Sequence, residues 1–167
     1  MNGKSPVINL DDVTLEQAGP FGEAGSFEAK TGAVGQAVGA GKLGSKLVVV
    51  PPGKRAWPFH LHHANEEMFV ILAGSGTLRY GEDRFPLRAN DVIAAPPGTG
   101  KAHQIINDSD AELRYLAIST MEHPEVAEYP DSDKIGVVAG SPPGRRPYDL
   151  FYFTRRQSGV DYWDGES

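Results

Sequence analysis

The chain has 167 residues, of which 40% are hydrophobic and 23% charged, which is the composition of a folded protein rather than a disordered one. The formal net charge of −6 argues against general nucleic-acid binding, and the lack of cysteine excludes disulfides, thiolate metal sites and cysteine nucleophiles. Residues 1–17 contain no signal-peptide core, and no apolar run reaches the roughly 20 residues of a membrane span. We therefore expect a cytoplasmic location and no membrane partner.

The beginning of the chain predicts little regular structure. Residues 1–25 are expected to be an irregular lead-in, with a short strand at Val7–Leu10 and a helical turn at Val13–Ala18. Another strand is expected at Ser26–Lys30. The glycine-rich run Thr31–Gly41 is interpreted as a flexible loop, because it lacks the lysine-serine/threonine ending of a phosphate-binding loop.

The middle of the chain carries the densest strand signal. Short apolar runs are separated by turns rich in glycine and proline, of which the chain has 20 and 13. Strands are predicted at Leu43–Val50, Trp57–His62, Glu67–Ala73, Thr77–Tyr80, Arg84–Leu87, Asp91–Ala95, His103–Asn107 and Leu113–Thr120. Seven or eight short strands at this spacing predict an all-β barrel or sandwich.

The last part of the chain differs in character, because prolines interrupt it and aromatic residues recur in it. The chain is therefore expected to consist of an N-terminal arm (1–41), a barrel core (42–121) and a C-terminal arm (122–167). The C-terminal arm is expected to be extended and packed on the barrel or on a partner. Since both faces of the strand Glu67–Ala73 are apolar and the arm needs a surface, we expect a homodimer.

Three histidines and a glutamate form the clearest functional pattern. In a strand, His60 and His62 point to the same side, and Glu67 begins the strand that returns next to them. His103 begins a later strand. Imidazole and carboxylate donors suit one divalent transition metal ion, such as zinc, iron, manganese or nickel. A purely structural metal, or histidines that only form hydrogen bonds, remain the alternatives.

These residues lie in two runs that resemble the two motifs of the cupin superfamily. HLHHANEEMFVILAG (60–74) resembles the first motif and PPGTGKAHQIIN (96–107) the second; the matching positions are His60, His62, Glu67, Gly74, Pro96, Gly98, His103 and Asn107. The resemblance covers residues 42–121. It implies a single double-stranded β-helix, or jelly-roll, barrel in which the three histidines and Glu67 are metal ligands.

The chain departs from the pattern at two points. Asn90 stands where the second motif begins with glycine, and the loop Thr99–Ala102 is two residues longer than usual, which puts the approach of His103 in question. Together with YLAIS and the closing DYWDGE, the motifs resemble a group of small single-domain cupins. Its members are mostly uncharacterised and are named sugar phosphate isomerases by inference.

Other residues are weaker candidates. Glu66 is the alternative carboxylate, but Glu67 also gives the correct spacing to Gly74. Lys101 and Arg55 flank the ligand segments and could meet an anionic substrate at the barrel mouth, although exposed loop charges are the more common case.

Tyr80 could line a pocket, although aromatic residues in barrels more often belong to the core. His63 and His123 are interpreted as surface residues. The basic pairs Arg145-Arg146 and Arg155-Arg156 are interpreted as solvated or intersubunit charges rather than phosphate contacts.

Three functions follow in order of preference. The first is a metal-dependent isomerase-like enzyme acting on a small polar substrate such as a sugar phosphate. The second is a mononuclear iron dioxygenase, and the third is a non-enzymatic module that binds or senses a small molecule. No residue outside the metal ligands stands out as the general base.

Overall fold

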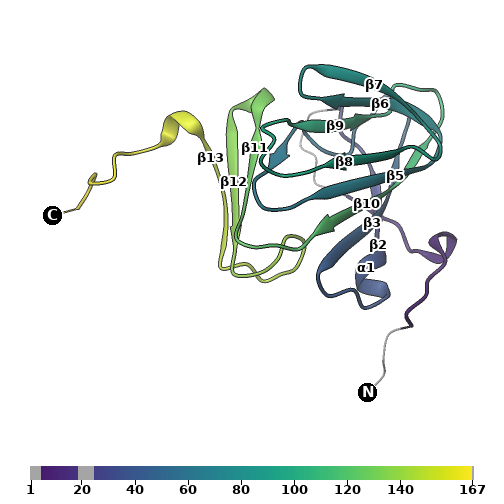
Figure 1. The fold of residues 1–167 in the computed structure, drawn as a ribbon, viewed down its shortest axis with the longest axis horizontal. Coiled ribbons are helices and arrows are strands. Elements are labelled where there is room, and N and C mark those ends of the chain that lie inside the picture. The colour runs from purple at the N-terminus through teal and green to yellow at the C-terminus, as the bar shows by residue number, and fades with distance from the viewer. Residues whose placement is uncertain (1–4, 19–24, 167) are drawn as a thin grey trace.

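The computed structural model describes residues 5–18 and 25–166 (Figure 1). The expected all-β fold is confirmed, with one four-residue helix among thirteen strands in the described ranges. Before the barrel core lie η1 (Leu10–Asp12), β1 (Glu16–Gln17), β2 (Lys30–Ala33) and α1 (Val34–Ala37). The core holds β3 (Leu43–Val50), β4 (Leu61–His62), β5 (Glu67–Ala73), β6 (Ser75–Tyr80), β7 (Asp83–Arg88), β8 (Val92–Ala95), β9 (His103–Ile106) and β10 (Leu113–Thr120). Beyond it follow β11 (Glu125–Tyr129), η2 (Pro130–Ser132), β12 (Lys134–Ala139), β13 (Leu150–Arg155) and η3 (Arg156–Ser158).

Two antiparallel sheets form the body of the barrel. The larger has the order β1-β2-β3-β10-β5-β8, and the smaller has the order β7-β6-β9 (Figure 1). Their inward side chains meet in one core, in which Val48, Ile71 and Tyr115 of the larger sheet pack with Leu78 and Ile105 of the smaller. Alternation along each strand, with apolar residues at every second position, produces these inward faces.

A third sheet, with the order β13-β12-β11-β4, joins the C-terminal part of the chain to the barrel. Strand β11 pairs with β4, and Ala127 lies opposite His62 in that register. The expected C-terminal arm thus contains three strands, and one of them borders a predicted ligand strand. Beyond β13, the C-terminal residues run away from the barrel in Figure 1.

Several sequence-based boundaries differ from the structure. In place of a helical turn at Val13–Ala18, the chain has the strand β1, and the 3-10 turn lies earlier, where Asn9 accepts a hydrogen bond from the amide of Asp11. The expected strand Val7–Leu10 is absent from the described residues, and of the expected lead-in, residues 1–4 and 19–24 lie outside them. The loop expected over Thr31–Gly41 contains most of β2 and all of α1.

The strand expected at Trp57–His62 is much shorter than predicted. Only Leu61–His62 are regular, because Pro58 has no amide hydrogen to donate to a neighbouring strand. His60 instead exchanges two backbone hydrogen bonds with His103, at 3.2 and 2.7 Å. This bridge brings the two histidines side by side.

Glycine is required at the end of β5. Gly74 has φ +83°, and a Cβ atom there would overlap the backbone carbonyl oxygen of Glu112. Only glycine avoids both the left-handed strain and the overlap. No helix in the described part of the chain is long and apolar enough to cross a membrane.

Candidate metal centre

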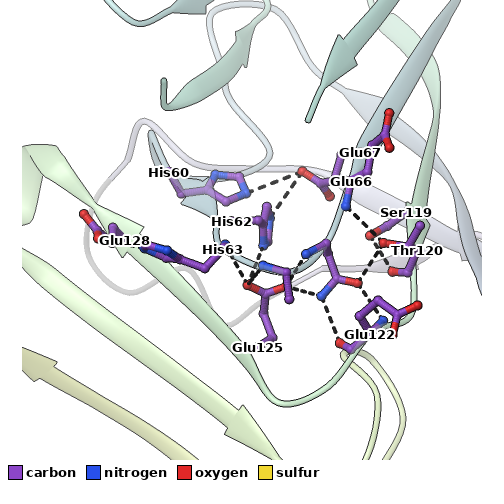
Figure 2. Close-up of polar contacts among 12 residues, drawn as sticks. His60, His62, His63, Glu66, Glu67, Ser119, Thr120, Glu122, Glu125 and Glu128 are labelled. Carbon is purple, nitrogen blue, oxygen red and sulfur yellow. Dashed lines mark hydrogen bonds and ion pairs between the residues drawn. The ribbon is translucent and has the colours of Figure 1, made fainter. Parts of the chain in front are cut away.

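The structure brings all four predicted ligands together at one end of the barrel interior. Oε2 of Glu67 lies 2.9 Å from Nε2 of His103, 3.3 Å from Nε2 of His62 and 3.9 Å from Nε2 of His60. One donor atom each from His60, His62 and Glu67 lies within 4.8 Å of the others. Figure 2 shows His60 and His62 directed toward the Glu67 carboxylate.

The backbone of the second motif explains how His103 reaches this point. The four-residue loop before it is accommodated by Gly98 and Gly100, which have φ +75° and +67°. Ala102 anchors the end of the loop by accepting a hydrogen bond from the amide of Gly81 at 2.8 Å. The longer loop therefore does not displace His103.

The other departure, Asn90, is also explained by backbone conformation. It has φ +76°, a left-handed conformation in which glycine is most common. Asparagine is among the non-glycine residues that adopt this conformation most readily. The turn therefore keeps its shape with asparagine in place of glycine.

A hydrogen bond fixes the orientation of the His60 ring. Nδ1 of His60 lies 2.7 Å from the carbonyl oxygen of Pro58. A carbonyl can only accept, so Nδ1 carries the proton and Nε2 presents its lone pair toward Glu67. This is the tautomer that a metal ligand requires.

The converging atoms satisfy a simple test for a metal site. Nε2 of His62, Nε2 of His103 and Oε2 of Glu67 are all buried, and none makes a hydrogen bond with proper geometry in the described part of the chain. Buried polar atoms normally have partners, and several that lack one around a common point fit a cation. The donor set of three nitrogens and one oxygen suits a divalent transition metal.

Sequence reasoning missed one residue of this site, Glu125 at the start of β11. Glu125 is only 3% exposed, and its carboxylate accepts hydrogen bonds from the backbone amides of His63 at 3.1 Å and Asn65 at 2.9 Å, and from the Asn65 side-chain amide. Oε1 also lies 3.7 Å from Nδ1 of His62, on the side away from Glu67 (Figure 2). Glu125 therefore holds the turn after His62 and faces the rear of that ring.

Asn65, which is also buried, ties the same turn to the end of β10. Its Oδ1 accepts hydrogen bonds from Oγ1 of Thr120 at 3.1 Å and from the amide of Glu122 at 2.8 Å. A signal for Glu125 existed in the alternation of PEVAEY, in which Glu125 and Ala127 share one buried face. Nothing in that alternation indicates that this strand lies next to β4.

The electrostatics of the cluster differ from one ring to the next. Burial lowers the pKa of His60 to about 4, and the neighbouring His103 adds to the effect. Burial also acts to lower the pKa of His62, but the carboxylates of Glu125 and Glu67 outweigh it and raise that pKa to about 9.

The two carboxyl groups respond in the opposite sense. Burial acts to raise their pKa values, but His103 and His62 hold the pKa of Glu67 well below its usual range. His62 and Asn65 lower the pKa of Glu125 to about 2. Both carboxylates are therefore charged at neutral pH, and binding of a cation must displace a proton from His62.

The cluster borders a cavity of about 300 Å³. Its walls are largely apolar, with Trp57, Phe69 and Tyr115 among the lining residues. Two cationic side chains, Lys46 and Arg145, also line it. A pocket of this kind, with apolar walls and a few polar groups, is typical of small-molecule sites.

The three predicted substrate contacts do not line this cavity. Arg55 forms backbone bridges with Phe27 and Ile106, and Nζ of Lys101 lies 5.6 Å from the centre of the Tyr80 ring. A role for Arg55, Tyr80 or Lys101 in substrate binding stays a prediction.

The alternative carboxylate and the remaining histidines lie outside the cluster. Glu66 is exposed and turned away from the histidines, in agreement with the choice of Glu67. His63 is exposed and its Nε2 lies 2.8 Å from Glu128, and His123 is exposed.

Comparison with known proteins identifies a domain in the middle of the chain. Residues 46–119 match the model of the cupin domain. This segment is a cupin domain. Outside the matched segment, the chain carries the N-terminal strands β1 and β2 and the C-terminal strands β11 to β13.

Two solved structures resemble this chain over almost its whole length. One is a candidate sugar phosphate isomerase from Acidithiobacillus ferrooxidans, with 25% identity, a TM-score of 0.79, and coverage of 94% of this chain and 96% of that one. The other is a cupin-superfamily sugar phosphate isomerase from Silicibacter pomeroyi, with 25% identity, a TM-score of 0.77, and coverage of 95% and 98%.

Curated relatives match a shorter segment. An oxalate-binding protein from Thermotoga maritima is 30% identical over 41% of this chain and 54% of its own length. The chain spans about half the length of the curated relatives it matches.

Proposed function

We propose that this cupin is a metal-dependent isomerase-like enzyme that acts on a small polar carbonyl compound such as a sugar phosphate. The observation that carries the proposal is the convergence of three histidine nitrogens and the Glu67 carboxylate at the border of a 300 Å³ cavity. The two full-length structural relatives, which are named as sugar phosphate isomerases, support the substrate class.

His60, His62, Glu67 and His103 would hold the ion. A divalent ion bound there supplies Lewis acidity, which polarises a carbonyl or hydroxyl oxygen and makes its neighbouring protons more acidic. The chain contributes the pre-set tautomer of His60 through Pro58.

The apolar walls of the cavity exclude water from the reacting atoms. Trp57, Phe69 and Tyr115 lie along them, and Tyr115 is only 1% exposed. Removing water strengthens every electrostatic interaction within the cavity.

Metal content and turnover test the proposal. Protein purified without added metal is assayed by elemental analysis, and aldose and ketose phosphates are screened by NMR for interconversion before and after chelation. We expect turnover that is lost on chelation and restored by one of zinc, iron, manganese or nickel. Full activity in metal-free protein, or no turnover of any aldose or ketose phosphate by the metal-loaded protein, would refute the proposal.

A matched pair of variants locates the site. Glu67→Gln is expected to lose metal and activity together, because it removes the one carboxylate of the cluster. Glu66→Gln changes the neighbouring, exposed carboxylate and should behave as the wild type. Equal loss in both variants would contradict the assignment of Glu67.

A non-catalytic binding module is the second candidate. It is favoured by the relative from Thermotoga maritima, which is named for binding oxalate rather than for a reaction. Thermal stabilisation by a small anion without turnover would favour this candidate. Iron as the purified metal together with oxygen uptake would instead indicate the dioxygenase alternative.

A further inference from the structure

Two cationic side chains that lie far apart in the sequence line the cavity of the metal cluster. Lys46 lies on β3, and Arg145 lies in the loop between β12 and β13. Among the lining residues, which all belong to the described part of the chain, Glu67 is the one carboxylate, and it is part of the metal cluster. The cavity therefore carries excess positive charge in a protein whose formal net charge is −6.

Arg145 is held in place by the loop that carries it. Its Nη2 donates to the carbonyl oxygen of Ala40 at 2.8 Å, and its backbone amide donates to Pro142 at 3.0 Å. The next residue back, Gly144, donates to the hydroxyl of Tyr148 at 2.8 Å. The bond to Ala40 uses one of the five N–H groups of the guanidinium, so the others can serve a ligand.

Lys46 lines the same cavity from strand β3. It pairs with Ala117 across the β3–β10 ladder and shares the inward face of β3 with the core residue Val48. Its Nζ lies 6.0 Å from the centre of the Trp57 ring. The side chain is exposed, which places it at the open rim.

Neither cation is neutralised by the protein. Within residues 5–18 and 25–166, no carboxylate forms an ion pair with Lys46 or Arg145. Arg79 and Arg156, by contrast, each pair with an aspartate or glutamate. A cation pair without a counter-charge at the rim of a cavity is suited to a small oxyanion.

A third polar group points to the shape of the ligand. Gln104 is only 3% exposed, its Nε2 donates to the carbonyl oxygen of Trp57 at 2.9 Å, and its Oε1 is buried without a hydrogen-bond partner among the described residues. Gln104 also lines the cavity. A buried acceptor without a partner is costly, and a ligand hydroxyl would satisfy it.

We propose that Lys46 and Arg145 bind the anionic group of the substrate, and that Oε1 of Gln104 accepts a hydrogen bond from one of its hydroxyls. The substrate is then a small hydroxylated compound with a phosphate or carboxylate at one end, and its other end faces the histidine cluster. Only the orientation of the substrate toward the histidine cluster rests on the proposed function. Binding of the anionic group by Lys46 and Arg145 does not require turnover. It also reassigns Arg145, which the sequence indicated as a solvated or intersubunit charge.

Calorimetric titration of the metal-loaded full chain tests the assignment. The ligands are inorganic phosphate, a sugar phosphate, the corresponding sugar acid and the neutral sugar. The variants are Lys46→Met and Arg145→Gln, with Lys42→Met and Arg146→Gln as neighbouring exposed controls. Metal content and thermal melting are measured for each variant, to show that folding and the metal cluster are intact.

Lys46→Met and Arg145→Gln should each weaken binding of the anionic ligands about tenfold to a hundredfold, since each removes a charge-assisted contact. The affinity for the neutral sugar and the metal content should not change, and the two control variants should bind as the wild type does. Whichever of the sugar phosphate and the sugar acid binds with the higher affinity identifies the oxyanion that the site prefers.

Wild-type affinity for anions in Lys46→Met and Arg145→Gln, an equal loss in Arg146→Gln, or no binding of any of the three anions by the wild type would each overturn the assignment. Failure of the proposed function is distinguishable from these outcomes. A protein that binds anions through Lys46 and Arg145 without isomerising them retains the site and loses the isomerase. An active enzyme whose KM is unchanged in both variants retains the isomerase and loses the site.

Discussion

Replacement of Glu125 by glutamine tests whether the C-terminal strand β11 supports the metal centre. The carboxylate accepts two well-formed hydrogen bonds from backbone amides, at 3.1 Å from His63 and 2.9 Å from Asn65, and a further one from the Asn65 side chain. A hydrogen bond to a charged acceptor contributes about 1.5–3 kcal/mol, and one to a neutral acceptor about 0.5–1.5 kcal/mol. Loss of the charge over two backbone bonds therefore costs about 2 kcal/mol.

The new amide group adds a second cost. One of the two carboxylate oxygens becomes an NH₂ group, which must face donors from His63 or Asn65, and an unsatisfied buried donor costs about 1–3 kcal/mol. We expect Glu125→Gln to lose about 3–5 kcal/mol of stability, which lies below most of the range of roughly 5–15 kcal/mol of a typical domain. The protein should therefore still fold.

The effect on metal binding follows from the position behind His62. Oε1 of Glu125 lies 3.7 Å from Nδ1 of that ring, and a carboxylate behind a ligand histidine orients it and increases its basicity. Loss of such a partner typically weakens metal affinity by about 10- to 100-fold.

Urea denaturation of the metal-free protein and competitive metal titration measure the two effects. Glu128→Gln is the control, since Glu128 lies on the same strand and pairs with the exposed His63 and with Arg156. Exposed pairs of this kind contribute about 0–1 kcal/mol. If Glu125→Gln matched Glu128→Gln in both stability and metal affinity, the supporting role of β11 would be refuted.

Three further predictions concern the backbone, pH and assembly. Gly74→Ala should lower the free energy of unfolding by more than about 2 kcal/mol, because it adds both left-handed strain and an overlap with Glu112. Gly53→Ala, at φ +72° with open space around it, should lose only the strain of about 1–2 kcal/mol. Equal midpoints of urea denaturation for the two variants would contradict this. The metal-free protein should be most stable near pH 6.5. Because the pKa of His60 is lowered on folding, stability falls as the pH drops from 6.5 toward 4, and because the pKa of His62 is raised on folding, stability falls as the pH rises from 6.5 toward 9. A melting temperature that does not change over this pH range would contradict the prediction. The homodimer expected from the sequence stays a prediction. Phe151 on β13 is 55% exposed, so Phe151→Ser should weaken self-association measured by sedimentation velocity. A wild-type protein that is monomeric at micromolar concentration would contradict the expected homodimer.

Local pattern in the sequence was enough to predict most strands of the barrel and the convergence of three histidines with Glu67. The predicted strands Leu43–Val50, Glu67–Ala73 and Leu113–Thr120 agree with the structure to the residue. Alternation of apolar side chains is a property of neighbouring residues, and so is the spacing of the first motif, which placed His60, His62 and Glu67 on one side.

Only the tertiary structure decided which distant segments complete the site. Glu125 contacts the turn at Asn65 across 60 positions of sequence, and Arg145 bonds to Ala40 across 105. Such contacts depend on which strands pair and on how a loop folds back over the barrel, and no periodicity within either segment encodes that choice. For the same reason Arg55, Tyr80 and Lys101, which lie near the ligands in the sequence or the ladder, do not line the cavity, whereas Lys46 and Arg145 do.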